Sequence, residues 1–390
     1  MKARQLALVM AAALSLGACS SLNPFASGDS KNKALKPLTN PVAITETWNV
    51  RLGNAGVFVL QPAQINGAVF AADSEGDVVR VESGRIVWKT RLKTTVSGGV
   101  GASADLVVVG TPKGEVIALD AASGEIKWRV AISAEVLAPP VVSDGIIVIR
   151  SADSRLFGLD PADGKRRWTY QRATPSLSLR SAAGVVLERN AILAGFPGGK
   201  LAAISPANGS LMWEGTVAVP RGATELERMA DITSLPVVGS RATCAVAYQG
   251  RVACFDMSNG STLWTRDLSS ARGLDLDENH VFVTDDKGAV HALDISSGAS
   301  AWKQDLLAGR GTGRPLASGE HVVVGDSEGY VHLLRKDDGS LVGRQRAASR
   351  PILADLQRAA GDIIVQMRDA NIAAVKVNYR RRLHGKPTFV

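Results

Sequence analysis

The sequence predicts an all-β fold: an eight-bladed β-propeller with four antiparallel strands per blade, closed by the N-terminal strand joining the C-terminal blade. Two observations carry this prediction, a repeat marked by tryptophans and a count of strands that leaves one strand unmatched at each end. The seven tryptophans of the 390-residue chain are Trp48, Trp88, Trp128, Trp168, Trp213, Trp264 and Trp302. Their spacing near 40 residues, together with strand-like sequences between them, is typical of propeller blades.

The residues before each tryptophan also repeat. Gly114, Asp120, Gly124 and Trp128 define offsets that recur from Gly250 to Trp264 and from Gly288 to Trp302. The first glycine is expected to close a hairpin with a positive φ, and the aspartate and second glycine to form the next turn. The tryptophan begins the outer strand and offers a large flat surface to the neighbouring blade. One late copy has Gly343 in place of the tryptophan.

The strand count predicts how the ring closes. Eight inner strand pairs lie near 68–80, 105–119, 145–159, 190–204, 240–255, 279–293, 320–334 and 361–377. The last pair has no outer strand after it, whereas the segment Trp48–Leu52 resembles an outer strand with no inner strands before it. We therefore expect Trp48–Leu52 to complete the C-terminal blade, which removes the open edge of a linear array.

The first residues predict export and lipidation. Lys2 and Arg4 precede an apolar stretch, residues 6–16, that is too short to span a bilayer. Small residues then lead to Cys19, in a pattern that resembles the lipobox of bacterial lipoproteins. The resemblance implies acylation of Cys19 after removal of residues 1–18; an ordinary signal peptide with a chance cysteine is the alternative. Ser20 stands where aspartate would retain such a protein at the inner membrane, so we expect the outer membrane, with the chain facing the periplasm.

The remaining boundaries follow from composition. Residues 19–43 are rich in Ser, Asn, Pro, Gly and Lys and predict a flexible, lipid-anchored tether, residues 44–378 form the propeller, and residues 379–390 form a basic tail. The net charge is +8. The tail is either solvated or in contact with anionic lipid headgroups or an acidic partner. Export makes nucleic acid a poor partner.

Enzymatic chemistry is not expected. The repeat resembles that of pyrroloquinoline-quinone dehydrogenases, which would imply a quinone cofactor and calcium. Those enzymes are longer and have adjacent cysteines, whereas no two cysteines are adjacent here, and the repeat itself is a packing device. His291 and His332 occupy the same repeat position, which blade duplication explains better than a metal site. We predict no catalytic residue, no cofactor and no metal.

Cys244 and Cys254 flank the hairpin Tyr248–Gly250. A three-residue loop would place them opposite each other across the ladder. In an oxidising compartment they could form a cross-strand disulfide. The alternative is a pair of small buried apolar side chains, and the sequence does not decide between the two.

Two blade-to-blade connections are longer than the rest, within the 45- and 51-residue gaps between tryptophans. One contains residues 173–180 and the other residues 221–231. Both link an outer strand to the next inner strand, and they are neighbours in the ring. We expect one continuous patch of leucine, arginine and acidic residues, which suits protein binding. The alternative is that the loops pack over the central channel.

The lipobox, the eight repeats and the segments Pro175–Arg180 and Gly222–Arg228 together resemble the BamB family, the lipoprotein subunit of the outer-membrane β-barrel assembly machine. The resemblance implies a non-catalytic scaffold that binds the periplasmic POTRA domains of BamA and assists unfolded outer-membrane proteins. The implied contact residues are Leu177, Leu179, Arg180 and Asp231. Thr233 stands where the family has a second aspartate, which puts the acidic half of the contact in doubt. A generic periplasmic propeller that binds another protein or peptide is the alternative.

Overall fold

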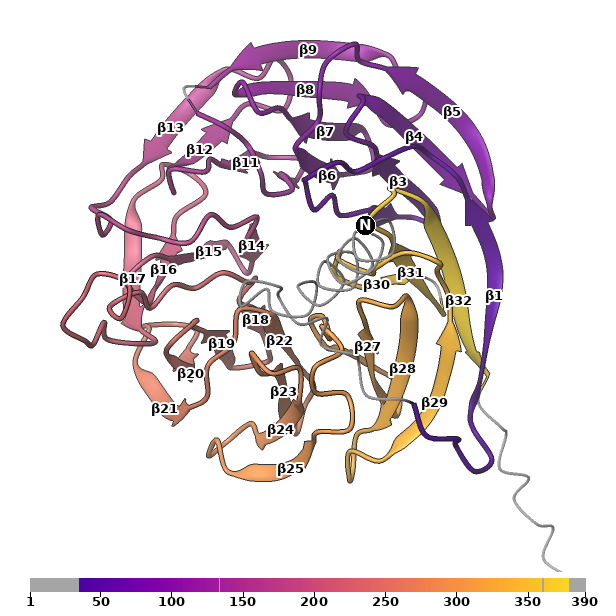
Figure 1. Cartoon of the computed structure of the whole chain (residues 1–390). Coiled ribbons are helices and arrows are strands. Elements are labelled where there is room, and N and C mark those ends of the chain that lie inside the picture. The colour runs from indigo at the N-terminus through magenta and orange to yellow at the C-terminus, as the bar shows by residue number, and fades with distance from the viewer. Residues whose placement is uncertain (1–34, 133, 360, 379–390) are drawn as a thin grey trace, which may run out of the picture. The chain divides into compact units, whose positions relative to one another are not determined.

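The computed structural model describes residues 35–378, except residues 133 and 360. Within these residues every regular element is a β-strand, and the 32 strands form eight four-stranded antiparallel sheets arranged as a ring (Figure 1). The predicted eight-bladed propeller is confirmed. No helix long and apolar enough to cross a membrane occurs in the described part of the chain.

The strands of each blade are given from the innermost to the outermost. The first four blades are β2 (Ala63–Ile65), β3 (Ala68–Ala72), β4 (Asp77–Glu82) and β5 (Arg85–Arg91); β6 (Gly98–Ala102), β7 (Leu106–Gly110), β8 (Glu115–Asp120) and β9 (Ile126–Ala131); β10 (Val141–Val142), β11 (Ile147–Arg150), β12 (Leu156–Leu159) and β13 (Arg166–Tyr170); and β14 (Val185–Glu188), β15 (Ala191–Phe196), β16 (Lys200–Ile204) and β17 (Leu211–Thr216). The last four are β18 (Val237–Val238), β19 (Ala242–Val246), β20 (Arg251–Asp256) and β21 (Thr262–Asp267); β22 (Gly273–Leu276), β23 (His280–Thr284), β24 (Val290–Asp294) and β25 (Ser300–Gln304); β26 (Leu316–Ser318), β27 (His321–Gly325), β28 (Tyr330–Arg335) and β29 (Leu341–Arg346); and β30 (Gln357–Ala359), β31 (Asp362–Gln366), β32 (Ile372–Asn378) and β1 (Ala43–Val50).

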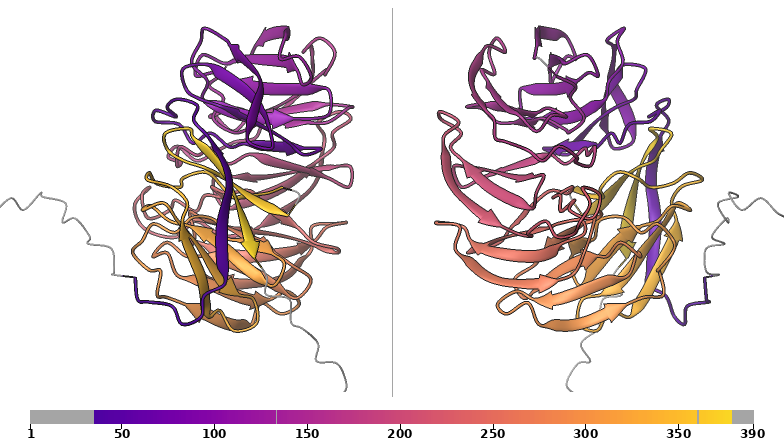
Figure 2. Two further views of the ribbon diagram at one scale, coloured as in Figure 1. Left: turned by 90° about the vertical axis from the view of Figure 1, so that its right-hand side faces the viewer. Right: turned by 60° about the vertical axis from the view of Figure 1, so that its left-hand side comes forward.

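The eighth blade closes the ring as predicted. Its three inner strands come from the C-terminal end of the described chain, and its outer strand is β1. The antiparallel register runs from Ala43 opposite Asn378 to Val50 opposite Ile372. Figure 2 shows β1 crossing the edge of the ring beside β32. The open edge of β32 is thereby paired by a strand from the other end of the chain.

Each tryptophan fastens its blade to the next one. In six blades the indole N–H donates to a backbone carbonyl of the following blade, for example from Trp88 to Ala121 at 3.0 Å and from Trp128 to Pro161 at 2.9 Å. The second glycine of the following repeat lies under the ring. At Gly124, where φ is +76°, an added Cβ would stand 2.7 Å from the ring of Trp88. The glycine is thus required both by the turn and by the stacked indole.

The first glycine of the repeat is less uniform than predicted. Gly114 has the expected positive φ of +77°. In the fifth blade, however, Gln249 adopts φ of +50° and Gly250 does not share it. The turn therefore places its left-handed residue one position earlier in that blade.

The copy without tryptophan precedes the eighth blade, and within the described residues this is the one blade in which no turn links the third strand to the outer strand. In the other blades the tryptophan of the preceding blade covers that turn, so a tryptophan at position 343 would have no turn to cover. Instead the N–H of Val42 donates to the carbonyl of Val342 at 2.8 Å, and the Val42 carbonyl lies against Gly343. Arg344 also donates to the carbonyl of Lys36 at 2.6 Å. The described residues Lys36 and Val42 of the predicted tether thus contact the propeller, and the boundary at residue 43 stays a prediction.

Candidate functional site

The connections from each outer strand to the next innermost strand lie on one side of the ring, together with the hairpins between second and third strands. We call this side the loop face. Hydrogen bonds join the two kinds of loop, as from Tyr248 N–H to the Asp231 carbonyl at 2.8 Å. The two longest connections are residues 171–184, between β13 and β14, and residues 217–236, between β17 and β18. They leave neighbouring blades, as predicted (Figure 1).

The Asp231 carboxylate joins the two long loops. One oxygen accepts a hydrogen bond from the Leu179 N–H at 2.7 Å, and the other accepts one from the Gly198 N–H at 3.0 Å. Asp231 itself is 2% exposed. Two backbone donors on one carboxylate make strong, charge-assisted hydrogen bonds, so this side chain fixes the position of the 171–184 loop.

A buried arginine lies in the same place. Arg150, at the end of β11, is 8% exposed and its guanidinium lies 5.4 Å from the centre of the Phe196 ring. Burial lowers the pKa of Arg150 to about 10, and the negative charge of Asp231 offsets part of that effect. Removing the carboxylate would leave this buried cation without its compensating charge.

Two further contacts make the long loops one surface. The Ser176 hydroxyl donates to the Glu225 carboxylate at 3.1 Å, and the Ser181 hydroxyl donates to the Thr233 carbonyl at 3.2 Å. The expected continuity of the two loops is therefore present. The resemblance implies Asp231 as a contact residue, and the structure buries its side chain beneath the surface that the two loops form.

The leucines and the arginine of the first loop differ in position. Leu177 is 37% exposed, whereas Leu179 is half-buried. Arg180 has a side chain 59% exposed, and its guanidinium contacts the Glu135 carboxylate at 2.7 Å. Because an exposed ion pair contributes only about 0–1 kcal/mol, Arg180 can exchange Glu135 for a carboxylate of a partner at little cost.

Leu179 and Arg180 also reach the mouth of the central channel. A cavity of about 390 Å³ is lined by both residues and by residues of the connections that enter five other blades, among them Val59, Arg272 and Leu353. Lining residues from so many blades place this cavity on the axis of the ring. The alternative reading, in which the loops pack over the channel, thus applies to Leu179 and Arg180, while Leu177 does not line the cavity.

Among the described residues, half of the exposed large apolar side chains lie in the connections of the loop face. Six lie in the connections, and the six others are on the outer strands β5, β9, β17 and β21. Those in the connections are Val57, Leu177, Val219, Leu226, Leu306 and Leu353. Sequence reasoning singled out only Leu177 of these, because single apolar residues in loops have no periodic signal. Leu226 extends the apolar surface onto the second long loop.

The repeated histidines are engaged within their own blades. His291 contacts Asp285 at 2.9 Å, and His332 contacts Asp326 at 2.9 Å. Among the described residues, no group of three or more His, Cys, Asp or Glu side chains could hold a metal ion. The pairs instead join each third strand to the hairpin that precedes it.

Cys244 and Cys254 stand directly opposite each other on β19 and β20, with Cα atoms 4.1 Å apart and a bond between their sulfurs. The hairpin that they staple carries Tyr248 and Gln249 against the second long loop. Cys19 lies outside the described residues.

Comparison with known proteins agrees on one family. The family model described as outer membrane protein assembly factor BamB matches residues 74–304 and 297–385. Outer membrane protein assembly factor BamB of Nitrosomonas eutropha is 43% identical over 326 residues, which are 83% of this chain and 80% of that protein. The protein of the same name from Bordetella pertussis is 38% identical over 95% of this chain and 97% of its own length. The crystal structure of BamB from Moraxella catarrhalis superposes with a TM-score of 0.80 at 28% identity, covering 86% of this chain and all of that one.

Proposed function

The chain belongs to the BamB family of outer membrane protein assembly factors, and on that basis we propose that it is a scaffold in the assembly of outer-membrane β-barrels. In this role it binds the periplasmic POTRA domains of BamA, the central barrel subunit, through the two long connections of the loop face. The family is one of assembly factors and not of enzymes. The chain thus acts by binding.

The observation that carries the proposal is the joined surface of the loops 171–184 and 217–236. A rigid ring holds both loops at one side, and one buried carboxylate fixes them to each other. Exposed Leu177 and Leu226 then lie on a surface with few conformational degrees of freedom, which lowers the entropy cost of binding. Apolar anchors next to an arginine are typical of binding hot spots.

The residues of the two long loops have different roles in this proposal. Leu177 supplies exposed apolar area for an apolar site on the partner. Arg180 exchanges its contact with Glu135 for a carboxylate of the partner. Leu179 holds the loop at the channel mouth, and Asp231 positions Leu179 from below instead of touching the partner itself.

Attachment to the outer membrane is part of the same proposal. Lipidation of Cys19 would anchor the chain, with the propeller in the periplasm, where membrane-bound partners lie within reach. Several acyl chains provide firm attachment because each buried CH₂ contributes about 0.8 kcal/mol.

The test is co-purification from solubilised outer membranes. The Leu177→Ala plus Arg180→Ala variant should retain little of BamA, because it removes an apolar anchor and a charge at once. The matched control is Ile86→Ala plus Arg85→Ala, which removes the same chemistry from the outer strand β5. Wild-type recovery of the barrel subunit by the loop variant would contradict the proposal. Recovery of some other protein in place of barrel-assembly subunits would favour a generic periplasmic binding propeller.

A further inference from the structure

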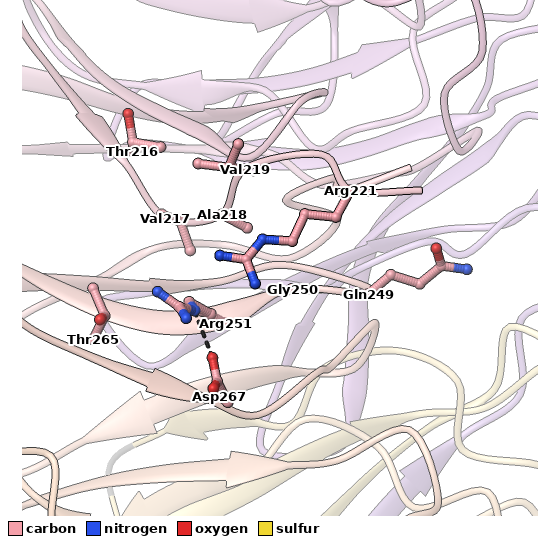
Figure 3. A pocket seen from close by; sticks show the side chains of 10 residues that line it. All are labelled: Thr216, Val217, Ala218, Val219, Arg221, Gln249, Gly250, Arg251, Thr265 and Asp267. Atoms are coloured by element: carbon pink, nitrogen blue, oxygen red, sulfur yellow. Dashed lines mark hydrogen bonds and ion pairs between the residues drawn. The ribbon is translucent and has the colours of Figure 1, made fainter. Parts of the chain in front are cut away.

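A pocket of about 160 Å³ lies beside the second long loop, between the end of β17 and the hairpin that leads into β20. Arg221 and Arg251 both extend into it, as Figure 3 shows, and Val217, Val219 and Thr265 form its walls. The space is many times the roughly 10–15 Å³ that one water molecule requires. It is large enough to receive a side chain.

The two arginines differ in what they already contact. Arg251 pairs with Asp267 at 2.5 Å, at the rim of the pocket. Within the described residues, the Arg221 side chain forms no hydrogen bond and no ion pair. The pocket therefore holds two positive charges and one negative charge, and one guanidinium is available to an incoming anion.

The neighbouring blade shows what completes such a pocket. In the fourth blade Lys200 occupies the repeat position of Arg251, directly after the glycine of the hairpin. There Glu214 lies between two cations, 3.5 Å from Lys200 and 2.9 Å from Arg172. In the second blade, an ion pair occupies the corresponding place beside the hairpin. It joins Glu115 and Arg129, which are 3.3 Å apart.

The fifth blade lacks that glutamate. Glu214 directly follows Trp213, and the residue that directly follows Trp264 is Thr265. A short hydroxyl side chain thus stands where the fourth blade has a carboxylate shared by two cations. The cations are present on both sides of the gap, and the carboxylate directly after the tryptophan is missing; Asp267 contacts Arg251 from the rim and leaves Arg221 without an anion.

From this geometry we propose that the pocket binds an acidic side chain of a protein partner, a glutamate, in the place that Glu214 fills in the blade before. The proposal rests on the proposed function, because the pocket adjoins the loop that carries Leu226 and gives the same partner a second point of contact. A guanidinium donates two parallel hydrogen bonds to a carboxylate. Val217 and Val219 suit the methylene groups of a glutamate. The single uncompensated charge matches a monoanionic carboxylate better than a dianionic phosphate.

The first experiment tests the pocket directly in the full-length protein. Arginine modification by phenylglyoxal, followed by mass spectrometry, reports the access to each guanidinium. N-acetylglutamate N-methylamide should slow modification of Arg221, and the glutamine analogue should not. Arg85, an exposed arginine on β5, is the internal control. Absence of protection would overturn the proposal, and stronger protection by inorganic phosphate would overturn the assignment to a carboxylate.

A second experiment places a glutamate at the position that corresponds to Glu214 of the fourth blade. Thr265→Glu restores the shared carboxylate, so it should slow modification of Arg221 without any added ligand. It should also lower co-purification of the barrel subunit about tenfold, equivalent to about 1.4 kcal/mol, because the pocket is then filled from within. Thr265→Gln should change recovery less than twofold. Unchanged modification of Arg221 in Thr265→Glu would show that the two positions do not share a site.

The two proposals fail in different ways. If Thr265→Glu and Arg221→Gln recover the barrel subunit like wild type while the Leu177 and Arg180 double variant does not, the pocket proposal falls and the proposed function stands. If wild-type protein recovers no barrel subunit, the proposed function falls, and the footprinting result alone decides whether the pocket accepts a glutamate.

Discussion

Replacing Asp231 separates a positioning role from a direct contact. The carboxylate accepts hydrogen bonds from the backbone N–H groups of Leu179 and Gly198 and lies near the buried cation of Arg150. Hydrogen bonds to charged groups contribute about 1.5–3 kcal/mol each. Asp231 and Arg150 form no ion pair in the described structure, so the loss of attraction between their charges adds to the loss of the two hydrogen bonds without breaking a direct contact.

These contributions overlap, so we expect Asp231→Ala to lower the free energy of unfolding by about 3–5 kcal/mol. That is a large part of the roughly 5–15 kcal/mol that stabilises a typical domain. Asp231→Asn should have a smaller effect of the same sign, since the amide keeps one acceptor but turns its NH₂ group toward an N–H donor. Glu225→Gln, on the exposed part of the same loop, should change stability by less than about 0.5 kcal/mol.

Two assays check the mechanism. Urea unfolding at pH 7 measures the loss of stability, and brief trypsin digestion measures the release of the 171–184 loop, because Arg180 is an exposed cleavage site within it. Cleavage after Arg180 should accelerate in Asp231→Ala. A variant that unfolds at the wild-type urea concentration, with unchanged cleavage, and yet loses the barrel subunit would refute the reasoning and assign Asp231 a direct contact.

The remaining predictions concern the ring. Gly124→Ala should destabilise the protein by about 1–3 kcal/mol in thermal unfolding, because its Cβ would meet the ring of Trp88 at a positive φ; Gly67→Ala, where an added Cβ meets nothing within 4 Å, controls for the backbone effect. Thiol titration of the denatured, unreduced protein should detect neither Cys244 nor Cys254, and two free thiols would contradict the bond. The repeated turn aspartates should make the fold acid-sensitive: hydrogen bonds from the backbone of Ser123 and from Lys127 lower the pKa of Asp120 to about 2, so its contribution is full above pH 4 and is lost as the pH falls toward 2. Asp120→Asn should therefore be less stable than wild type at pH 7, and the difference should shrink as the pH falls from 4 and vanish below pH 2; a constant difference across that range would contradict the assignment. Deleting residues 43–50 should expose β32 and cause aggregation, measured by light scattering.

The ring could be predicted because its determinants are local and repeated. Each tryptophan and its glycine are separated by a nearly constant number of residues, and the unmatched strand at each end follows from counting. The innermost strands could not be placed in this way, since they are only two to five residues long and give no alternating pattern. The packing of Val42 against Gly343 could not be predicted either, because neither segment carries a sequence pattern that indicates contact with the other.

Only part of the candidate site could be predicted from the sequence, for a different reason. The long loops are visible as departures from the repeat, and Leu177 and Arg180 follow from the resemblance of one of these loops to the BamB family. The arginines of the pocket next to Thr265 could not, because their meaning appears only when the fourth and fifth blades are compared position by position in space. A missing carboxylate becomes a signal only after the neighbouring blade shows where it belongs.

The burial of Asp231 changes the meaning of Thr233. If both positions were surface contacts, replacing an aspartate by Thr233 would remove half of an acidic surface. The Asp231 carboxylate, however, accepts hydrogen bonds from the Leu179 and Gly198 N–H groups and offsets part of the effect of burial on the pKa of Arg150. The Thr233 hydroxyl donates only a long hydrogen bond of 3.4 Å to the Ala271 carbonyl. The two positions therefore differ, since Asp231 holds the first long loop and the Thr233 hydroxyl forms a single long hydrogen bond. A chain that keeps Asp231 keeps the shape of the proposed binding surface, and the charge preference of that surface then depends on the residues around it, among them Arg221, whose side chain has no partner in the described structure.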